Sequence, residues 1–155
     1  MKTINVKKGQ ILQRKGDFNS KIYRVESGLL RSYSIDEKGK EHIFMFGPEG
    51  WFIVDNTPSS EPCELFIDAL EDSTVTQMEK DAAKDHDAQP LIKRLLALQK
   101  RIIMLMSLSA LERYDHFVET YPQIIQRVPQ KMIASYLGIT PEALSSAKSK
   151  RFQNK

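Results

Sequence analysis

The side chains best suited to chemistry gather near the C-terminal end of the chain, in residues 130–151. They carry amide, hydroxyl, carboxylate and cationic groups, which exchange hydrogen bonds with phosphate oxygens and with the edges of nucleic-acid bases. Lysine, arginine and glutamine suit phosphates, hydroxyls suit phosphates or bases, and a glutamate can accept from a cytosine amino group. The candidate DNA-binding residues are Gln130, Lys131, Thr140, Glu142, Ser145, Ser146, Lys148 and Lys150, with Arg151 as a further phosphate contact.

The spacing within this segment predicts the two helices that must position these side chains. A helix-turn-helix needs a small residue where its helices cross, a glycine at the turn, and apolar residues that bury the pair. Counting from Gln130, Ala134 is fifth, Gly138 is ninth and Leu144 is fifteenth. The other expected apolar positions are filled by Ile133, Leu137, Ile139 and Ala147. A purely structural pair of helices is the alternative interpretation.

The start of the second helix and the distribution of charge favour nucleic acid as the partner. Thr140 is a suitable N-cap, Pro141 suits the first helical position, and Glu142 suits the positive end of the helix. The net charge is only +3, but residues 127–155 hold six basic groups against one acidic group, or +5, so residues 1–126 carry −2. A basic tail on a nearly neutral body is typical of nucleic-acid binding, although a solvated tail would look the same.

The first eighty residues show short apolar runs separated by turns, which is typical of a β-sheet domain. Glycines at 28, 39 and 50 recur every eleven residues, a spacing typical of a β-sandwich, barrel or jelly roll. A ligand pocket would be easiest to build beside the polar loop at residues 55–62. The expected strands are Ile4–Val6, Gln10–Gln13, Lys21–Glu26, Leu29–Ile35, Glu41–Phe46, Glu64–Leu70 and Thr74–Glu79.

A helical pattern replaces the strand pattern after Asp81, which can cap a short helical turn, and Pro90 can stand in the first turn of a long helix. Two apolar stripes follow, one with a four-three spacing over about two heptads and one made of Ile92, Leu96, Ile103 and Met106. One stripe can pack on the chain's own β-module and the other on a second copy, while a helix buried on two sides of a monomer is the alternative. The predicted dimerisation residues are Leu91, Leu95, Leu98, Ile102 and Leu105, and a further helix is expected from Leu111 to Tyr121.

Residues 126–145, which read QRVPQKMIASYLGITPEALS, resemble the DNA-binding module of Crp/Fnr-type transcriptional regulators, especially the short forms found in Bacteroidetes. Upstream, the runs KGQILQRKGD, YRVESGLLR, DEKGKE and EGWF resemble that family's cyclic-nucleotide-binding-like β-roll. The resemblance implies an α+β fold: an antiparallel β-roll or jelly-roll sensor in residues 1–85, a connecting and dimerisation helix in 86–110, and a helix-turn-helix domain in 111–155. It implies a homodimeric regulator that binds double-stranded DNA, with RNA polymerase and an unidentified small-molecule effector as further candidate partners.

The sensor module departs from the pattern of family members that bind cyclic nucleotides. Those members use a Gly-Glu pair for the ribose and an arginine for the cyclic phosphate, because a bidentate cation suits a phosphate. No arginine lies between Arg31 and Arg94, and acidic residues stand where the arginine belongs. We therefore expect no binding of cyclic AMP through the usual cassette. The effector-binding candidates are Glu49, Gly50, Trp51, Ser59 and Ser60, and a ligand-free loop is the alternative.

The second helix of the pair departs as well. The family commonly has an arginine that reads a guanine, whereas this chain has Ser145 and Ser146 after Leu144. Losing such a bidentate contact removes about 1–3 kcal/mol of base discrimination. We therefore expect weak or relaxed sequence specificity.

Several classes of protein are disfavoured. The single Cys63 excludes an intramolecular disulfide, a Cys-rich zinc site and a self-contained iron–sulfur cluster, and His42, His86 and His116 form no metal-binding spacing. No nucleotide-binding or hydrolase motif occurs. The most apolar stretch is ten residues, too short to cross a membrane, and the N-terminus lacks a secretory signal.

We therefore expect a cytoplasmic protein that is not an enzyme, with no catalytic residues, no metal, no cofactor and no membrane partner. Two alternatives stay open. One is a dimerising interaction protein whose degenerate helix-turn-helix binds no specific DNA. The other is a cupin-like small-molecule-binding protein or enzyme, which would need clustered histidine and carboxylate ligands that the sequence lacks.

Overall fold

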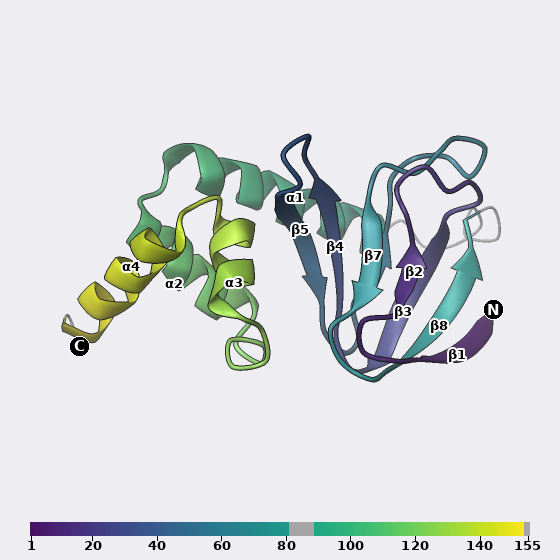
Figure 1. Ribbon diagram of the computed structural model, residues 1–155, viewed down its shortest axis with the longest axis horizontal. Helices are drawn as coiled ribbons and strands as arrows, with labels where there is room; N and C mark the ends of the chain where they lie inside the picture. Colours follow the sequence, from purple (N-terminus) through teal and green to yellow (C-terminus); the bar gives the residue numbers. More distant parts are fainter. Residues whose placement is uncertain (81–88, 154–155) are drawn as a thin grey trace. The chain divides into compact units, whose positions relative to one another are not determined.

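The computed structural model describes residues 1–80 and 89–153, with side chains described for 1–80 and 97–151. The chain divides into two compact units, Met1–Asp85 and His86–Lys155. The first unit is built from strands and the second from helices (Figure 1). The cap predicted at Asp81 and the histidine at position 86 lie outside the described residues.

Eight strands form two four-stranded antiparallel sheets in the first unit, visible as two layers in Figure 1. One sheet has the order β1-β8-β3-β6 and the other the order β2-β7-β4-β5. This arrangement confirms the predicted antiparallel β-roll. The strands are β1 (Lys2–Val6), β2 (Ile11–Gln13), β3 (Lys21–Ser27), β4 (Leu30–Ile35), β5 (Glu41–Gly47), β6 (Phe52–Val54), β7 (Phe66–Ala69) and β8 (Ser73–Glu79).

The apolar side chains between the two sheets form the core of this unit. Alternation along β3 buries Tyr23 and Val25 while Arg24 and Glu26 face solvent, as expected for a sheet with one solvated face. The buried cluster comprises Val6, Tyr23, Val25, Leu30, Ile53, Ile67, Ala69 and Val75. β6 was not predicted, whereas the equally short β2 was, because Gly9 and Gly16 mark turns on either side of it.

One ion-paired arginine is buried in the second sheet. Arg31 on β4 stands opposite Asp68 on β7, and its guanidinium donates to both carboxylate oxygens at 2.8 and 3.0 Å. A further bond of 2.6 Å reaches Glu41. Burial opposes the charged form, but the hydrogen bonds to Asp68 and Glu41 outweigh burial and raise the pKa of Arg31. Its charge is therefore fully engaged within the sheet.

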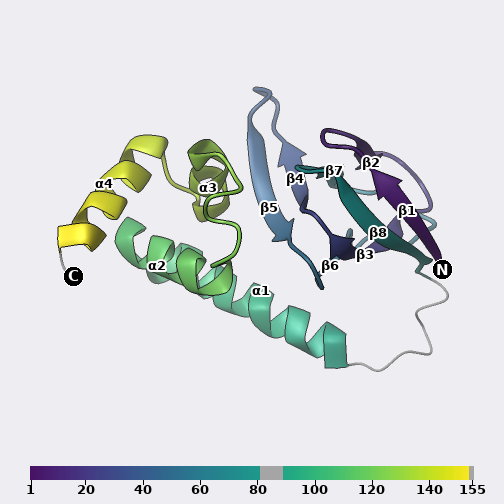
Figure 2. The same cartoon turned by 90° about the horizontal axis from the view of Figure 1, so that it is seen from below.

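Within residues 89–153, the described part of the second unit, four helices form: α1 (Gln89–Ser107), α2 (Ala110–Thr120), α3 (Gln130–Leu137) and α4 (Pro141–Gln153). α2, α3 and α4 pack against one another (Figure 2). A capping box starts α2, in which the Ser109 hydroxyl accepts from the Glu112 N–H and the Glu112 carboxylate accepts from the Ser109 N–H. Three aromatic residues, Phe117, Tyr121 and Tyr136, meet with ring centroids 5.4–5.6 Å apart and join α2 to α3.

The long helix α1 exposes an apolar surface near its C-terminal end. Met104 is 1% exposed, whereas Ile102, Ile103 and Met106 are 57%, 55% and 82% exposed. Leu98 and Leu105 are half-buried, and the side chains of Leu91 and Leu95 lie outside the described residues. The exposed surface therefore combines Ile102 of the predicted dimerisation stripe with residues of the neighbouring stripe.

Candidate nucleic-acid interface

One side of α4 carries most of the predicted DNA-binding residues. Leu144 and Ala147 are buried on the opposite side, with 1% and 3% exposure. Because successive helical residues are turned by about 100°, the exposed side has a definite centre and two edges. Lys148 and Lys150 stand at those edges, and Lys148 is half-buried. The centre, which we call the α4 face, consists of Pro141, Glu142, Ser145, Ser146 and Ser149.

Local signals fix where α4 begins. Gly138 has φ +65° and ψ +33°, the left-handed conformation that ends α3. The N–H groups of Gly138 and Ile139 donate to the carbonyls of Ser135 and Ala134, which closes the last turn. The Thr140 hydroxyl then accepts from the Ala143 N–H at 3.2 Å, so Thr140 caps α4 as its sequence position indicated.

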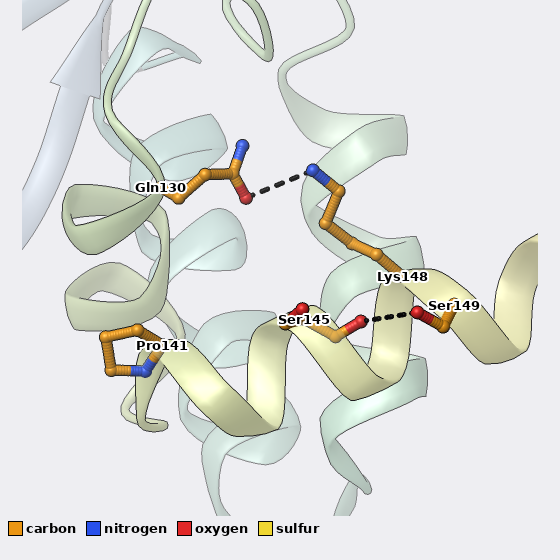
Figure 3. Close-up of a pocket in the computed structure, with 5 residues that line it drawn as sticks. All are labelled: Gln130, Pro141, Ser145, Lys148 and Ser149. Atoms are coloured by element: carbon orange, nitrogen blue, oxygen red, sulfur yellow. Dashed lines mark hydrogen bonds between the residues drawn. The ribbon is translucent and has the colours of Figure 1, made fainter.

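A pocket of about 450 Å³ lies between the start of α3 and the α4 face (Figure 3). The Lys148 ammonium donates to the Gln130 side-chain oxygen at 3.2 Å and thereby links the two helices. The Ser149 hydroxyl donates to the Ser145 carbonyl at 3.1 Å. The lining residues are Gln130, Pro141, Ser145, Lys148 and Ser149. Ser149 was not among the predicted residues, although its position four residues after Ser145 placed it on the same side of the helix.

The predicted basic residues have different surroundings. Lys131, next to Gln130 in the first turn of α3, is exposed, and so is Lys150. Arg151, in contrast, pairs with Asp115 on α2 at 2.6 Å, and its guanidinium lies 5.7 Å from the centre of the Tyr114 ring. Arg151 thus anchors α4 on α2, a role that its sequence position alone did not reveal.

Arg113 on α2 fastens three helices together. Its guanidinium donates to the carbonyls of Leu105 at 2.8 Å, Leu108 at 2.9 Å and Leu137 at 3.0 Å. These carbonyls lie at or just beyond the C-terminal ends of α1 and α3, where helices leave acceptors unsatisfied and where a cation is favoured. Sequence analysis missed Arg113, because its partners lie up to 24 positions away.

A second arginine ties α1 directly to α3. Arg101 donates to the Tyr136 carbonyl at 3.2 Å, and its guanidinium lies 4.2 Å from the centre of the Tyr136 ring. Burial lowers the pKa of Arg101. A guanidinium above an aromatic face is stabilised by the ring quadrupole. Arg101 and Arg113 together link the C-terminal end of α3 to the long helix α1.

The predicted effector residues fall into two groups at opposite ends of β3. The Glu49 carboxylate accepts from the Gly28 N–H at 3.1 Å, and Gly50 and Trp51 bond to Val25, all near the C-terminal end of β3. The Ser59 carbonyl accepts from the Asn19 N–H, near the other end, where Ser60 is exposed. A pocket of about 260 Å³ lies beside Asn19, lined by Leu12, Gln13, Asp17, Phe18, Asn19, Ser20, Lys21, Tyr23 and Gln77. The five candidates therefore do not form one cluster.

Among the residues that the structure describes, no group of three or more histidine, cysteine, aspartate or glutamate side chains is arranged to hold a metal ion. Within those same residues, no helix combines the length and the apolar character needed to cross a membrane.

Comparison with known proteins places the first unit in a family. A family model described as a cyclic nucleotide-binding domain matches residues 3–86. The chain is 27% identical to the anaerobic regulatory protein of Haemophilus influenzae and 29% identical to the fumarate and nitrate reduction regulatory protein of Yersinia pestis. Each comparison covers 90% of this chain but only 63% and 64% of the relative, so the chain spans slightly less than two thirds of their length.

Solved structures share the fold of the whole chain. FixK2 from Bradyrhizobium japonicum superposes with a TM-score of 0.81 at 20% identity, covering 99% of this chain and 85% of that one. A transcriptional regulator of the CRP/FNR family from Thermus thermophilus gives a TM-score of 0.80 at 18% identity, covering 99% and 87%. The described strands and helices therefore have the same fold as these two solved structures.

Proposed function

The chain belongs to the cyclic nucleotide-binding domain family and has the fold of Crp/Fnr-type regulators, and from this premise we propose that it is a homodimeric DNA-binding transcription regulator. The observation that carries the proposal is the α4 face, in which three serines accompany Pro141 and Glu142, with Lys148 and Lys150 at its edges. Small residues let a helix approach base edges closely, while lysines at the edges reach the phosphates on either side of a groove.

In this proposal α4 enters the major groove. Lys131, Lys148, Lys150 and Gln130 contact phosphates, while Thr140, Ser145 and Ser146 contact bases or phosphates and Glu142 accepts from a cytosine amino group. Ser149 joins them on the evidence of the pocket it lines. Because the α4 face has no arginine to read a guanine, base discrimination is weak, and affinity depends chiefly on phosphates.

A second copy of the chain completes the proposed regulator. Ile102, Ile103 and Met106 are each more than half exposed on one side of α1, and apolar surface of this kind marks an interaction site. Pairing of two α1 helices, with Leu91, Leu95, Leu98 and Leu105 extending the contact, would place two α4 helices about 34 Å apart, one turn of DNA.

The remaining parts of the proposal rest on the family and on composition. The β-roll does not bind cyclic AMP in the usual way, since the first unit offers no arginine in the cassette position. A neutral or cationic effector would bind either at Ser59 and Ser60 or at Glu49, Gly50 and Trp51, because these two groups lie at opposite ends of β3. A cytoplasmic location, the lack of enzymatic activity and contact with RNA polymerase belong to the same proposal.

The test is salt-dependent binding of labelled duplex DNA, followed by fluorescence anisotropy. Replacing Lys148 or Lys150 by glutamine should weaken binding uniformly across DNA sequences and reduce the slope of log affinity against log salt by about 1 per residue. Lys38→Gln, on an exposed turn of the first unit, is the matched control and should leave the slope unchanged. Absence of salt-dependent DNA binding by the unaltered protein would favour a dimerising interaction protein instead.

A further inference from the structure

A buried carboxylate organises the 55–65 loop, which connects β6 to β7. Asp55 is 2% exposed. One of its oxygens accepts from the Thr57 N–H at 2.9 Å and the Thr57 hydroxyl at 2.6 Å. The other accepts from the N–H groups of Glu64 at 2.9 Å and Leu65 at 2.8 Å, and more weakly from the Gln13 amide at 3.4 Å. The carboxylate therefore gathers donors from both ends of the loop and from β2.

The donors that hold this negative charge are neutral. A buried carboxylate ordinarily needs a cation or takes up a proton. Burial acts to raise the pKa of Asp55, but the hydrogen bonds from Thr57, Leu65 and Glu64 outweigh burial and lower it. Asp55 is thus an anion held by backbone and side-chain N–H and O–H groups, the same kind of environment that binds phosphates in backbone nests.

Backbone hydrogen bonds join the 55–65 loop to residues 16–19 at several points. The Gly16 N–H donates to the Cys63 carbonyl at 2.8 Å, and the Cys63 N–H donates to the Asp17 carbonyl at 2.9 Å. The Asn19 N–H donates to the Ser59 carbonyl at 3.0 Å. These bonds fasten both halves of the loop to residues 16–19 and hold the donor groups around Asp55.

We propose that Asp55 is an intramolecular anion that occupies the donor groups a phosphate-bearing effector would need, so that the β-roll excludes such effectors and holds its loop closed without one. Arg31 does not supply a cation for such a phosphate either, because its guanidinium is held by Asp68 and Glu41 within the sheet. This assigns to one residue the exclusion of cyclic nucleotides that the missing arginine only suggests. It also confines any effector of this unit to molecules that do not require an anion site in the 55–65 loop.

Calorimetric titration of the full chain with cyclic AMP, and separately with inorganic phosphate, tests the exclusion. Neither ligand should bind the unaltered protein with a dissociation constant in the millimolar range or lower. Saturable binding of either ligand would overturn the proposal. Because these titrations contain no DNA, their result is independent of whether α4 binds DNA.

Chemical rescue tests the role of the carboxylate itself. Asp55→Ala should lower Tm, and formate should restore part of the loss beyond the effect of chloride at equal ionic strength, since a small carboxylate can refill the vacated donors. Asp72→Ala is the matched control: Asp72 also accepts a backbone N–H, from Lys8 at 2.9 Å, but its side chain is 65% exposed. That variant should show no formate-specific rescue.

An unchanged Tm for Asp55→Ala, or rescue by formate no larger than by chloride, would refute the assignment. If Asp55→Ala does not fold, Asp55→Asn takes its place, because the amide keeps the size of the side chain and one acceptor oxygen while leaving two donor groups opposed by its own N–H. Because this amide fills the space of the carboxylate, formate has no vacated position to enter, so Asp55→Asn should lower Tm equally in formate and in chloride, and an unchanged Tm would refute the assignment.

Discussion

Gly28 is the residue at which backbone conformation and space together exclude a side chain. Its φ is +92°, and a Cβ added there would lie 2.3 Å from the Ser73 hydroxyl oxygen and 2.7 Å from the Asp72 carbonyl oxygen. Gly39 has a similar φ of +76° but nothing within 4 Å of an added Cβ. The pair therefore separates the cost of a left-handed backbone from the cost of a clash.

Alanine at each glycine gives a direct prediction. Gly39→Ala should lower the free energy of unfolding by about 1–2 kcal/mol, the cost of a left-handed L-residue. Gly28→Ala should cost at least ~2 kcal/mol more, because the hairpin entering β8 must also move. Urea unfolding of both variants measures the difference. Equal losses would mean that the contact with Ser73 relaxes freely.

Residue roles set by local rules could be predicted from the sequence, whereas roles set by distant partners could not. The Thr140 cap and the left-handed Gly138 follow from neighbours one to five positions away. Asp55 and Arg113 depend on acceptors or donors brought together by the fold. Apart from Thr57 for Asp55 and Leu108 for Arg113, their partners lie 8 to 42 positions away, so the neighbouring sequence does not reveal them.

At the scale of elements, the helix pair and most of the antiparallel strands were predictable, because they are long enough to show their period or, like the short β2, are bounded by glycine turns. The short β6 was not, and neither was the arrangement of apolar residues on α1. The stripe pattern assigned Ile102 and Leu105 to one surface, yet Ile102 is 57% exposed while Leu105 is half-buried against the helix unit, near Gly138. Periodicity fixes which residues share a side, but only packing decides which side is covered.

The hydrogen bonds of Arg113 lead to a prediction about how the helices are held together. Arg113→Lys keeps the charge but cannot reach three carbonyls with one planar group, so stability should fall by about 2 kcal/mol and DNA affinity should fall by about tenfold. Ser109→Ala is the control: it removes the cap of α2, at a cost of about 1 kcal/mol, without touching α3. Thermal unfolding and anisotropy measure both effects. If DNA affinity falls in proportion to the loss of stability in both variants, Arg113 has no separate role in positioning α3.

At the scale of the molecule, the chain divides into a unit of strands and a unit of helices, and the helical unit holds both α1 and α4. Arg101 and Arg113 bond α1 and the residues just after it to α3. Any rearrangement of paired α1 helices would therefore be passed to the helix pair through these hydrogen bonds. In the proposed dimer, a change in the pairing of α1 would change the spacing of the two α4 helices.

Replacing Ile102 and Met106 together by glutamine tests that pairing. These side chains are 57% and 82% exposed, so the change should leave the fold of one copy intact, unlike a change at the half-buried Leu98. We expect the mass by light scattering to halve and DNA affinity to fall by about a hundredfold, because the two half-sites are then bound separately. Phe18→Gln, at a residue 60% exposed on the first unit, controls for the loss of exposed apolar surface and should change neither. An unaltered mass in the α1 variant would mean that this surface does not join two copies, and the spacing of the α4 helices would need another origin.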